Sequence, residues 1–522
     1  MSRHSSANEW LWSCVRQCGR SCRGHGKVTA CGAATISAVL SFAGGAPSVS
    51  AQAGGTVTTP SPRASVQREE LAEYQGVYGY HGDTSIVLVA GDTLLFAVID
   101  EAKYPLRPLG DDRFLNGAGE TILFRRSGDG IVSGFVEGTT FFARRTPVVD
   151  RDVVATVRAV PRPVGAHGRP ARYVYTVPAD LADGLLVGDV SQTGVDPARV
   201  IDLVNKVLDG TYPDVHGVLV HQGGRLVVEE YFYDYDRERP HQMRSASKSI
   251  VSALVGIAID RGVIASDREL VTRHLPYTGY ANPDPRKTQL TLRDILTMRS
   301  GLACDDWDAR SPGNESRVYE SEDWVKYVLD LPMADPPGTQ GRYCSGNVHV
   351  AGRIVERATG MPLPAFAQRE LFGPLGIRAD SVRWNFTLSS SNAATFAQLY
   401  LRPRDMLKVG VLFQQHGNWG GRQVISRQWV AQSTAQLSTV GDQRYGYFWW
   451  HQWLNVSSPE GTRRVDMVVA TGNGGQKIYL VPSLDLVVVL TGGNYNATRS
   501  PATEIMSKEL LTAFLSRTAA AK

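Results

Sequence analysis

Short runs of hydrophobic residues, broken by turns, mark the front part of the chain. Between residues 69 and 145 these runs are rich in β-branched, aromatic and aliphatic residues, and glycine and aspartate separate them. The clearest runs are Ser85–Ala90, Leu94–Ile99, Thr121–Arg125 and Ile131–Val136. The pattern predicts a small all-β domain over residues 64–148, expected to cover or pack on its neighbour, with ligand binding as the alternative.

Residues 149–171 are rich in proline and glycine and show no periodicity. This composition is typical of a linker. A larger domain is therefore expected over residues 172–520.

The larger domain has a strand pattern at both of its ends. After a helical stretch over Pro197–Leu208, the runs Gly217–His221 and Arg225–Tyr231 are joined across Gly223 and Gly224, which predicts a hairpin. A second hairpin is predicted from Gln476–Val481 and Leu486–Thr491, and a final helix begins after Ser500. Helical sequence fills the middle. The fold class is therefore α+β: an antiparallel sheet flanked by helices, with an inserted helical region.

The charge is concentrated at the start of the chain. The formal net charge is +4, and residues 1–53 hold five of the 55 basic residues but one of the 51 acidic ones, so the remainder is balanced. A balanced remainder offers no basic surface for phosphates, so we expect no nucleic-acid partner.

The basic start leads into an apolar stretch, Val28–Ala43, and then into small residues up to Ala53. This order predicts a signal peptide over residues 1–53, with export to the periplasm or medium. A plain N-terminal extension is the alternative. Later segments lack the roughly 18 apolar residues that span a bilayer, so we expect no stable membrane insertion.

Six cysteines are present, and four of them lie before residue 32. Cys304 and Cys344 remain in the predicted mature chain, where two thiols in an oxidising compartment favour one disulfide. A buried free thiol at Cys344 is the alternative. The early cysteines lack an obvious fourth ligand, so no metal site is predicted.

A short motif opens the most strongly apolar helix of the middle region. The run Met243–Ile250 contains Ser245 and Lys248, three residues apart. That spacing puts the lysine amine within reach of the serine hydroxyl. First-turn amides have no helical partner and carry partial positive charge, so the amide of Ser245 can face an oxyanion. The motif predicts a nucleophile; a capping serine beside a solvated lysine is the structural alternative.

A tyrosine on a Pro/Gly-rich turn is the candidate partner for that lysine. Tyr343 lies in the run Pro337–Asn347, just before a helical stretch over Val348–Thr359. A purely structural tyrosine is the alternative. His241 precedes Ser245 by four residues, but the sequence places no acid behind it, so we expect a structural histidine.

With these motifs, the segment from about Tyr173 to Leu515 resembles the serine beta-lactamase-like family. That family includes class C beta-lactamases, D-alanyl-D-alanine carboxypeptidases, esterases and 6-aminohexanoate-dimer hydrolases. Further matching stretches occur in the family's order, at Leu290–Leu302, Pro403–Met406 and Tyr445–Trp450.

The resemblance implies catalytic roles for Ser245, Lys248 and Tyr343. Tyr343 opens the family's Y-x-N motif, and its third position here is Ser345, which we count among the substrate-binding candidates. The lysine and the phenol would titrate as one unit, with either a charged lysine beside a phenolate or a neutral lysine as base.

The family's third motif, a lysine or histidine followed by a small residue and glycine, falls on Asn473–Gly475. Asn473 therefore stands where the family has a basic residue, which argues against beta-lactam and D-Ala-D-Ala substrates. Gly475 would let a substrate approach closely, and the amide of Gln476 would be the second oxyanion donor. A plain glycine-rich turn, or a register shift onto Ala470–Gly472, remains open.

The sequence thus predicts a serine hydrolase that cleaves a small ester or amide through an acyl-enzyme on Ser245, with no metal or organic cofactor. The alternatives are a beta-lactamase or D,D-peptidase, and a non-catalytic binding protein that kept the fold. Oligomeric state does not follow from the sequence.

Overall fold

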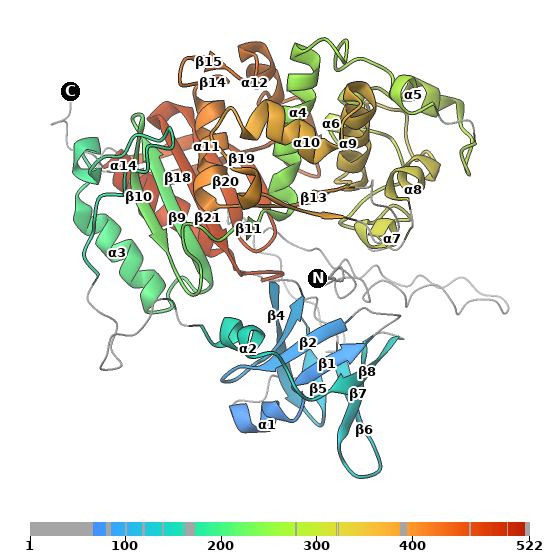
Figure 1. The fold of residues 1–522 in the computed structure, drawn as a ribbon, viewed down its shortest axis with the longest axis vertical. Helices are drawn as coiled ribbons and strands as arrows, with labels where there is room; N and C mark the ends of the chain where they lie inside the picture. The colour runs from blue at the N-terminus through green and yellow to red at the C-terminus, as the bar shows by residue number, and fades with distance from the viewer. Residues whose placement is uncertain are drawn as a thin grey trace, which may run out of the picture. The chain divides into compact units, whose positions relative to one another are not determined.

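A computed structural model describes residues 66–79, 85–99, 102–116, 121–137, 140–159, 161, 173–276, 279–308, 310–319, 321, 323–386, 394–458, 461–497 and 499–516. The predicted signal peptide lies outside the described residues. The chain divides into two compact units (Figure 1), Met1–Arg158 with Asn496–Arg499, and Ala159–Tyr495 with Ser500–Lys522.

The first unit contains a closed antiparallel barrel of eight strands in sequence order, β1 to β8. The strands are β1 (Gly76–Gly79), β2 (Ser85–Ala90), β3 (Leu95–Ile99), β4 (Ala102–Gly110), β5 (Arg113–Leu115), β6 (Thr121–Arg126), β7 (Val132–Glu137) and β8 (Thr140–Thr146). Aromatic side chains pack together in its core: Phe135 stacks on Phe142 with ring centroids 4.7 Å apart, and Tyr78 lies 5.2 Å from Phe135. The expectation of a small all-β domain is confirmed.

Helix α1 (Arg68–Ala72) precedes the barrel, and α2 (Arg151–Arg158) follows it. Residues 151–158 had been predicted as linker. They form a helix because Val153, Val154 and Val157 give it an apolar side, which packs against the buried core residues Val89 and Val98.

The second unit is built on an eight-stranded sheet, in the order β10-β9-β21-β20-β19-β18-β17-β16. Its strands are β9 (Val215–Gln222), β10 (Arg225–Tyr231), β16 (Ser438–Val440), β17 (Gln443–Tyr445), β18 (Trp450–Ser458), β19 (Gly461–Gly472), β20 (Gln476–Val481) and β21 (Leu486–Gly492). Each of its neighbouring strand pairs is antiparallel. The β9–β10 turn uses Gly223 and Gly224 with φ of 58° and 80°, the backbone that a two-residue hairpin requires.

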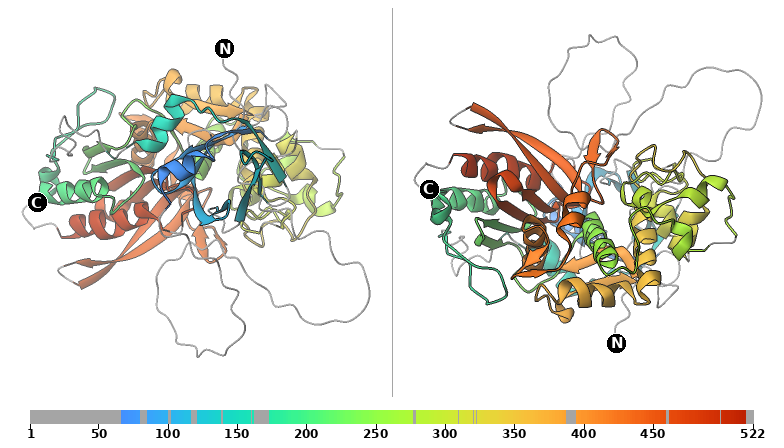
Figure 2. Two further views of the ribbon diagram at one scale, coloured as in Figure 1. Left: turned by 90° about the horizontal axis from the view of Figure 1, so that it is seen from below. Right: turned by 90° about the horizontal axis from the view of Figure 1, so that it is seen from above.

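Helices cover the sheet (Figures 1 and 2). Helix α11 (Pro403–Gln414) packs on β9, β20 and β21. The C-terminal helical segment, which contacts β18 and β21, consists of α13 (Pro501–Glu504), the π-helix Ile505–Leu510 and α14 (Leu511–Leu515). Helix α3 (Pro197–Leu208) packs on that C-terminal segment and begins at Asp196, whose side chain accepts the Ala198 amide. Segments from both ends of this unit thus form the sheet and the helices that cover it.

The middle of the chain forms the helical region. It contains α4 (Ser247–Asp260), α5 (Val271–His274), α6 (Leu292–Leu296), α7 (Glu315–Tyr319), α8 (Trp324–Asp330), α9 (Gly346–Thr359) and α10 (Leu363–Ala367). Helix α4 lies between the sheet and the rest of this region (Figure 1) and packs on both β19 and α9. It is buried from Ser247 to Ala258, on all of its faces, because apolar and small residues surround it.

Smaller elements complete the unit. They are the three-stranded sheet of β11 (His241–Gln242), β13 (Ala394–Leu401) and β12 (Arg383–Phe386), the hairpin β14 (Asn418–Trp419) with β15 (Arg422–Gln423), and α12 (Arg427–Ser433). In the described ranges, no helix is both long and apolar enough to cross a bilayer.

Candidate active site

Ser245 lies at the entrance to helix α4. It is in a 3₁₀ turn, Arg244–Ala246, that runs directly into the helix. Arg244 has φ of 51°, a strained value for a residue with a side chain. The amide of Met243 donates to the Leu399 oxygen at 2.9 Å. Strand β13 and the strained residue together set the direction in which Ser245 faces.

Lys248 is already bonded to this serine. Its Nζ donates to Ser245 Oγ at 2.8 Å. Lys248 is 1% exposed, whereas Ser245 is half-buried. The amine is therefore fixed below a hydroxyl that solvent can reach.

The environment keeps Lys248 charged. Burial lowers its pKa, but the nearby Tyr343, Glu315 and Asp306 raise it, and the net result is a raised pKa. A buried ammonium held by negative groups can stabilise a neighbouring phenolate. The structure thus favours the charged-lysine form of the two that the sequence left open.

Tyr343 lies on the loop before α9, next to this ammonium. Lys248 Nζ is 5.1 Å from the centre of the Tyr343 ring, and a hydrogen bond to Tyr343 helps to raise the lysine pKa. The ring of Trp307 stacks on Tyr343 at 5.5 Å, and Trp450 lies 5.5 Å from Tyr343 on a tilted plane. The three predicted catalytic residues therefore lie together, with an aromatic wall beside them.

The loop that carries Tyr343 is cross-linked. Cys304 and Cys344 form a disulfide with a Cα–Cα distance of 5.4 Å. The prediction of this bond is confirmed. Because Cys344 adjoins Tyr343, the bond restricts the movement of the tyrosine.

Ser345 does not face solvent. It is 1% exposed, its amide donates to Asp306 Oδ2 at 2.7 Å, and its hydroxyl donates to Glu315 Oε2 at 3.3 Å. Neither acid was predicted from the sequence. Their only sequence signal was acidic residues close to Cys304, one of the two paired cysteines.

The end of strand β19 borders the nucleophile turn. A side-chain carbon at Gly472 would lie 2.2 Å from the Met243 oxygen and 3.1 Å from Arg244 Cβ. Only glycine permits this approach, because real side-chain carbons do not come so close. Of the two registers left open by the sequence, the one on Ala470–Gly472 is the one whose glycine touches this turn.

The turn that follows holds the other predicted residues, Asn473, Gly475 and Gln476. Gly475 has φ of 97°. Gln476 is fully buried, pairs with Gly472 across the ladder, and its side chain bonds both the amide and the oxygen of Gly492. The Gln476 side chain thus braces the hairpin, whereas the side chain of Asn473 in the same turn is exposed.

Two of the other matching stretches, Leu290–Leu302 and Tyr445–Trp450, also meet at α4. Ser249 Oγ donates to the Phe448 oxygen at 2.6 Å, and the Phe448 amide donates to the Leu296 oxygen at 3.2 Å. Residues of α4, of the segment before β18 and of α6 are thereby joined around the helix that carries the serine.

His241 is in a buried aromatic group. Its Nε2 lies 2.9 Å from His216 Nδ1, and its ring stacks on Tyr235 at 4.7 Å. Burial lowers its pKa to about 4. These contacts are structural, as the sequence analysis expected.

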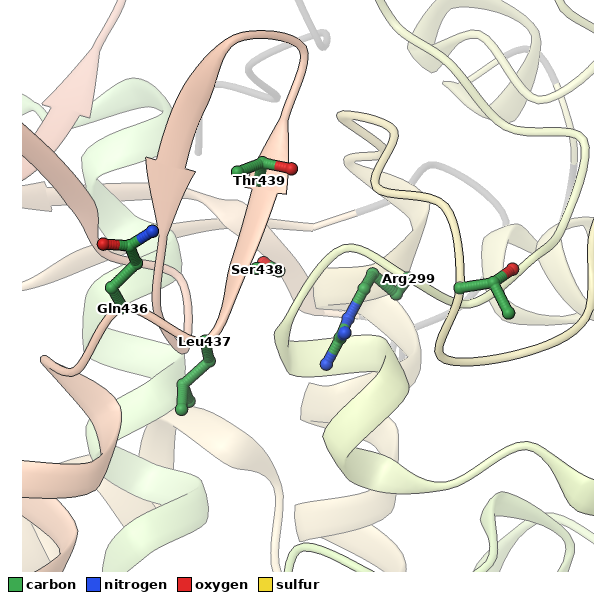
Figure 3. Close-up of a pocket in the computed structure, with 6 residues that line it drawn as sticks. Arg299, Gln436, Leu437, Ser438 and Thr439 are labelled. Carbon is green, nitrogen blue, oxygen red and sulfur yellow. The ribbon is translucent and has the colours of Figure 1, made fainter.

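A polar cavity of about 280 Å³ lies near the tyrosine loop. Arg299 lies on one side and residues 436–439 lie on the other (Figure 3), and Thr339 also lines the cavity. Its lining contains none of Ser245, Lys248 and Tyr343, so it is distinct from the hydroxyl–amine–phenol group. In the described part of the chain, no three His, Cys, Asp or Glu side chains gather as a metal site would require.

A family model described as beta-lactamase matches residues 210–504. This range contains the whole hydroxyl–amine–phenol group.

Three curated relatives illustrate the activities found among similar chains. A 6-aminohexanoate-dimer hydrolase of Paenarthrobacter ureafaciens is 25% identical over 52% of this chain and 70% of its own. Esterase EstB of Burkholderia gladioli is 28% identical over 32% of this chain and 42% of its own. A D-aminopeptidase of Cereibacter sphaeroides is 28% identical over 34% of each chain. The match thus spans less than half of the last two relatives.

Solved structures also match. A family VIII carboxylesterase shows 15% identity and a TM-score of 0.47, covering 61% of this chain and 94% of its own. A 6-aminohexanoate-dimer hydrolase homologue from Bacillus anthracis shows 16% identity and a TM-score of 0.46, covering 57% and 78%.

Proposed function

The chain belongs to the beta-lactamase family and is a serine hydrolase, and from this premise we propose that it cleaves carboxylic esters or short linear amides through an acyl-enzyme on Ser245. The observation that carries the proposal is the 2.8 Å hydrogen bond between Lys248 Nζ and Ser245 Oγ, beside Tyr343. Covalent hydrolysis requires a serine held beside a group that activates it, and here the lysine orients the hydroxyl while Tyr343 is the proposed proton acceptor.

In the acylation step, Tyr343 acts as a phenolate held by the Lys248 ammonium. It takes the proton of Ser245 while Oγ bonds to the substrate carbonyl carbon. The oxyanion accepts hydrogen bonds from the amide of Ser245 and from an amide of the Asn473–Gln476 turn. When the tetrahedral intermediate collapses, the C–O or C–N bond breaks and Tyr343 returns its proton to the leaving group.

Deacylation repeats these transfers with water. Tyr343 takes a proton from water, the hydroxyl adds to the acyl carbon, and the bond to Ser245 Oγ breaks. The proton then returns to Ser245. Lys248 stays charged in both steps, in agreement with its raised pKa.

The proposed substrate class is supported by the missing basic residue of the third motif and by two of the relatives. The family has a basic residue at the first position of its third motif. That position is Asn473 on the predicted register and Ala470 on the other one, and neither residue offers a cation to a substrate carboxylate. The two relatives described as an esterase and an amide-dimer hydrolase support ester or linear-amide substrates. The Cys304–Cys344 disulfide is compatible with the exported location that we also propose.

The test is covalent labelling followed by mass mapping. A fluorophosphonate probe should modify the wild-type chain at Ser245, and Ser245→Ala should lose both the label and ester hydrolysis. Ser249→Ala, on the same helix but bonded to the Phe448 oxygen, is the control and should keep the label. An unlabelled wild-type chain would favour a non-catalytic binding protein.

Substrate preference needs a separate comparison. We expect turnover of a p-nitrophenyl ester or a short linear amide to exceed turnover of nitrocefin. The reverse order would favour a beta-lactamase or D,D-peptidase instead.

A further inference from the structure

Three links join Cys304–Asp306 to Tyr343–Ser345. One is the disulfide between Cys304 and Cys344. The amide of Asp306 donates to the Tyr343 oxygen at 2.7 Å, and the amide of Ser345 donates back to Asp306 Oδ2 at 2.7 Å. The backbone on both sides of Cys344 is therefore held by a single residue, Asp306.

The other oxygen of Asp306 is also in use. Asp306 Oδ1 accepts the amide of Glu315 at 2.8 Å, at the start of helix α7. The carboxylate of Glu315 in turn accepts the hydroxyl of Ser345 at 3.3 Å. The two acids and the serine thus form a closed set of hydrogen bonds behind the tyrosine loop.

This set explains the residue at position 345. Ser345 donates a hydrogen bond to each of the two acids, from its amide to Asp306 and from its hydroxyl to Glu315. The small hydroxyl serves here as a donor that attaches the loop to Glu315. The departure from the Y-x-N pattern therefore accompanies a different support for the tyrosine.

The same acids act on the lysine. Lys248 of α4 is surrounded by Glu315 at the start of α7, Asp306, Tyr343 and His349 of α9. Burial, and secondly the charge of Glu315, raise the pKa of Asp306 to about 7, while Lys248 and Ser345 act to lower it. Asp306 is therefore ionised above that pH, where its charge supports the ammonium.

We propose that Asp306 and Glu315 are positioning residues of the hydrolytic site, which fix the loop of Tyr343 through their hydrogen bonds and set two carboxylates behind the Tyr343–Lys248 pair. The inference rests on the proposed acyl-enzyme function. Neither acid is required to touch the substrate, since both act through Lys248 and the tyrosine loop.

The experiment compares pH profiles of kcat/KM for a p-nitrophenyl ester. Asp306→Asn removes the charge and can accept only one of the two amide donors, and we expect kcat/KM to fall by about tenfold or more. Glu315→Gln keeps an oxygen for the Ser345 hydroxyl and removes only the charge. In both variants the alkaline limb should move to lower pH, because Lys248 loses its proton more readily without the acid.

Asp308→Asn is the matched control. It makes the same change on the same loop, but Asp308 pairs with Arg310 instead. Its alkaline limb should stay where the wild-type limb lies. If Asp306→Asn does not fold, Glu315→Gln alone decides the charge effect.

The outcomes separate the two proposals. If fluorophosphonate labels Ser245 in the wild type but both variants keep the wild-type rate and alkaline limb, the positioning role is wrong and the acyl-enzyme stands. Lower stability with an unmoved limb likewise overturns it, since that is a structural effect alone. If the wild type itself is not labelled, the acyl-enzyme proposal is wrong, and the positioning role that rests on it is wrong as well.

Discussion

Burial and neighbouring charges shift the pKa of Lys248 in opposite directions. Desolvation favours the neutral amine, yet the negative groups around it raise its pKa overall. The serine hydrogen bond at 2.8 Å then holds the ammonium in one place. A charge fixed in this way needs no reorganisation when the oxygen of Ser245 attacks, which is the condition for electrostatic catalysis.

Replacement of Lys248 by methionine tests this residue. Lys248→Met fills a similar volume but removes the proton donor, so kcat should fall by about 10³ with a smaller change in KM. Steady-state kinetics with a p-nitrophenyl ester measure both constants.

Lys287→Met is the control for burial. Lys287 is 3% exposed and lies 4.6 Å from the centre of the Tyr280 ring, but its Nζ bonds the Leu329 oxygen. An equal loss of kcat in both variants would mean that the loss comes from destabilisation and not from the catalytic amine.

At the scale of elements, the site depends on how closely strand β19 approaches the turn before α4. Gly472 ends the strand and lies against the Met243 oxygen and Arg244. Arg244 itself has positive φ, so the turn has little freedom to retreat. The strand end, the turn and the helix start are therefore closely packed against one another.

Gly472→Ala should disturb this arrangement. The added carbon would lie 2.2 Å from the Met243 oxygen, so the strand must shift away from the nucleophile turn. Misplacement by about 1 Å lowers rates by about a hundredfold, and we expect a kcat/KM decrease of that order.

The control is Gly279→Ala, where an added carbon meets no atom within 4 Å and the backbone φ lies outside the strained range. This variant should retain wild-type kcat/KM. Wild-type activity in Gly472→Ala would show that the close approach has no role in orienting Ser245.

At the scale of the whole molecule, buried histidines link stability to pH. Burial lowers the pKa of His221 and His241 to about 4 and that of His349 to about 3. An unfolded histidine titrates near 6.5, so between these values the unfolded chain binds more protons than the folded one. The contribution of these histidines to the free energy of unfolding is complete above about pH 6.5 and is lost as the pH falls toward 4.

The free energy of unfolding, measured by denaturant titration from pH 7.5 to 4, should show this loss. His241→Asn should reduce the dependence on pH, because one group no longer gains a proton on unfolding. His416→Asn is the control, since His416 is exposed and asparagine tolerates its φ of 54°. The same slope in wild type and His241→Asn would contradict the expectation.

Local sequence was sufficient wherever one periodicity or one turn decided the structure. Helix α3 and strands β2, β10 and β20 have the predicted bounds, because side-chain alternation, helix caps and the Gly223–Gly224 turn are local properties. The linker prediction failed at α2 because its three valines need the barrel surface to form an apolar face. The polar first half of β19 likewise carries no inward pattern, and this strand was not predicted from the sequence.

The sequence by itself determined the candidate catalytic residues: Ser245 and Lys248 have the three-residue spacing that brings a hydroxyl near an amine, and Tyr343 follows a Pro/Gly turn. Only the tertiary structure decided that Asp306, Glu315 and Gly472 support them, because these residues are 61 or more positions from Ser245. Their contacts with the site form only when the sheet and the helical region close around α4. Spacing fixes short-range geometry, but long-range contacts depend on the packing of the whole unit.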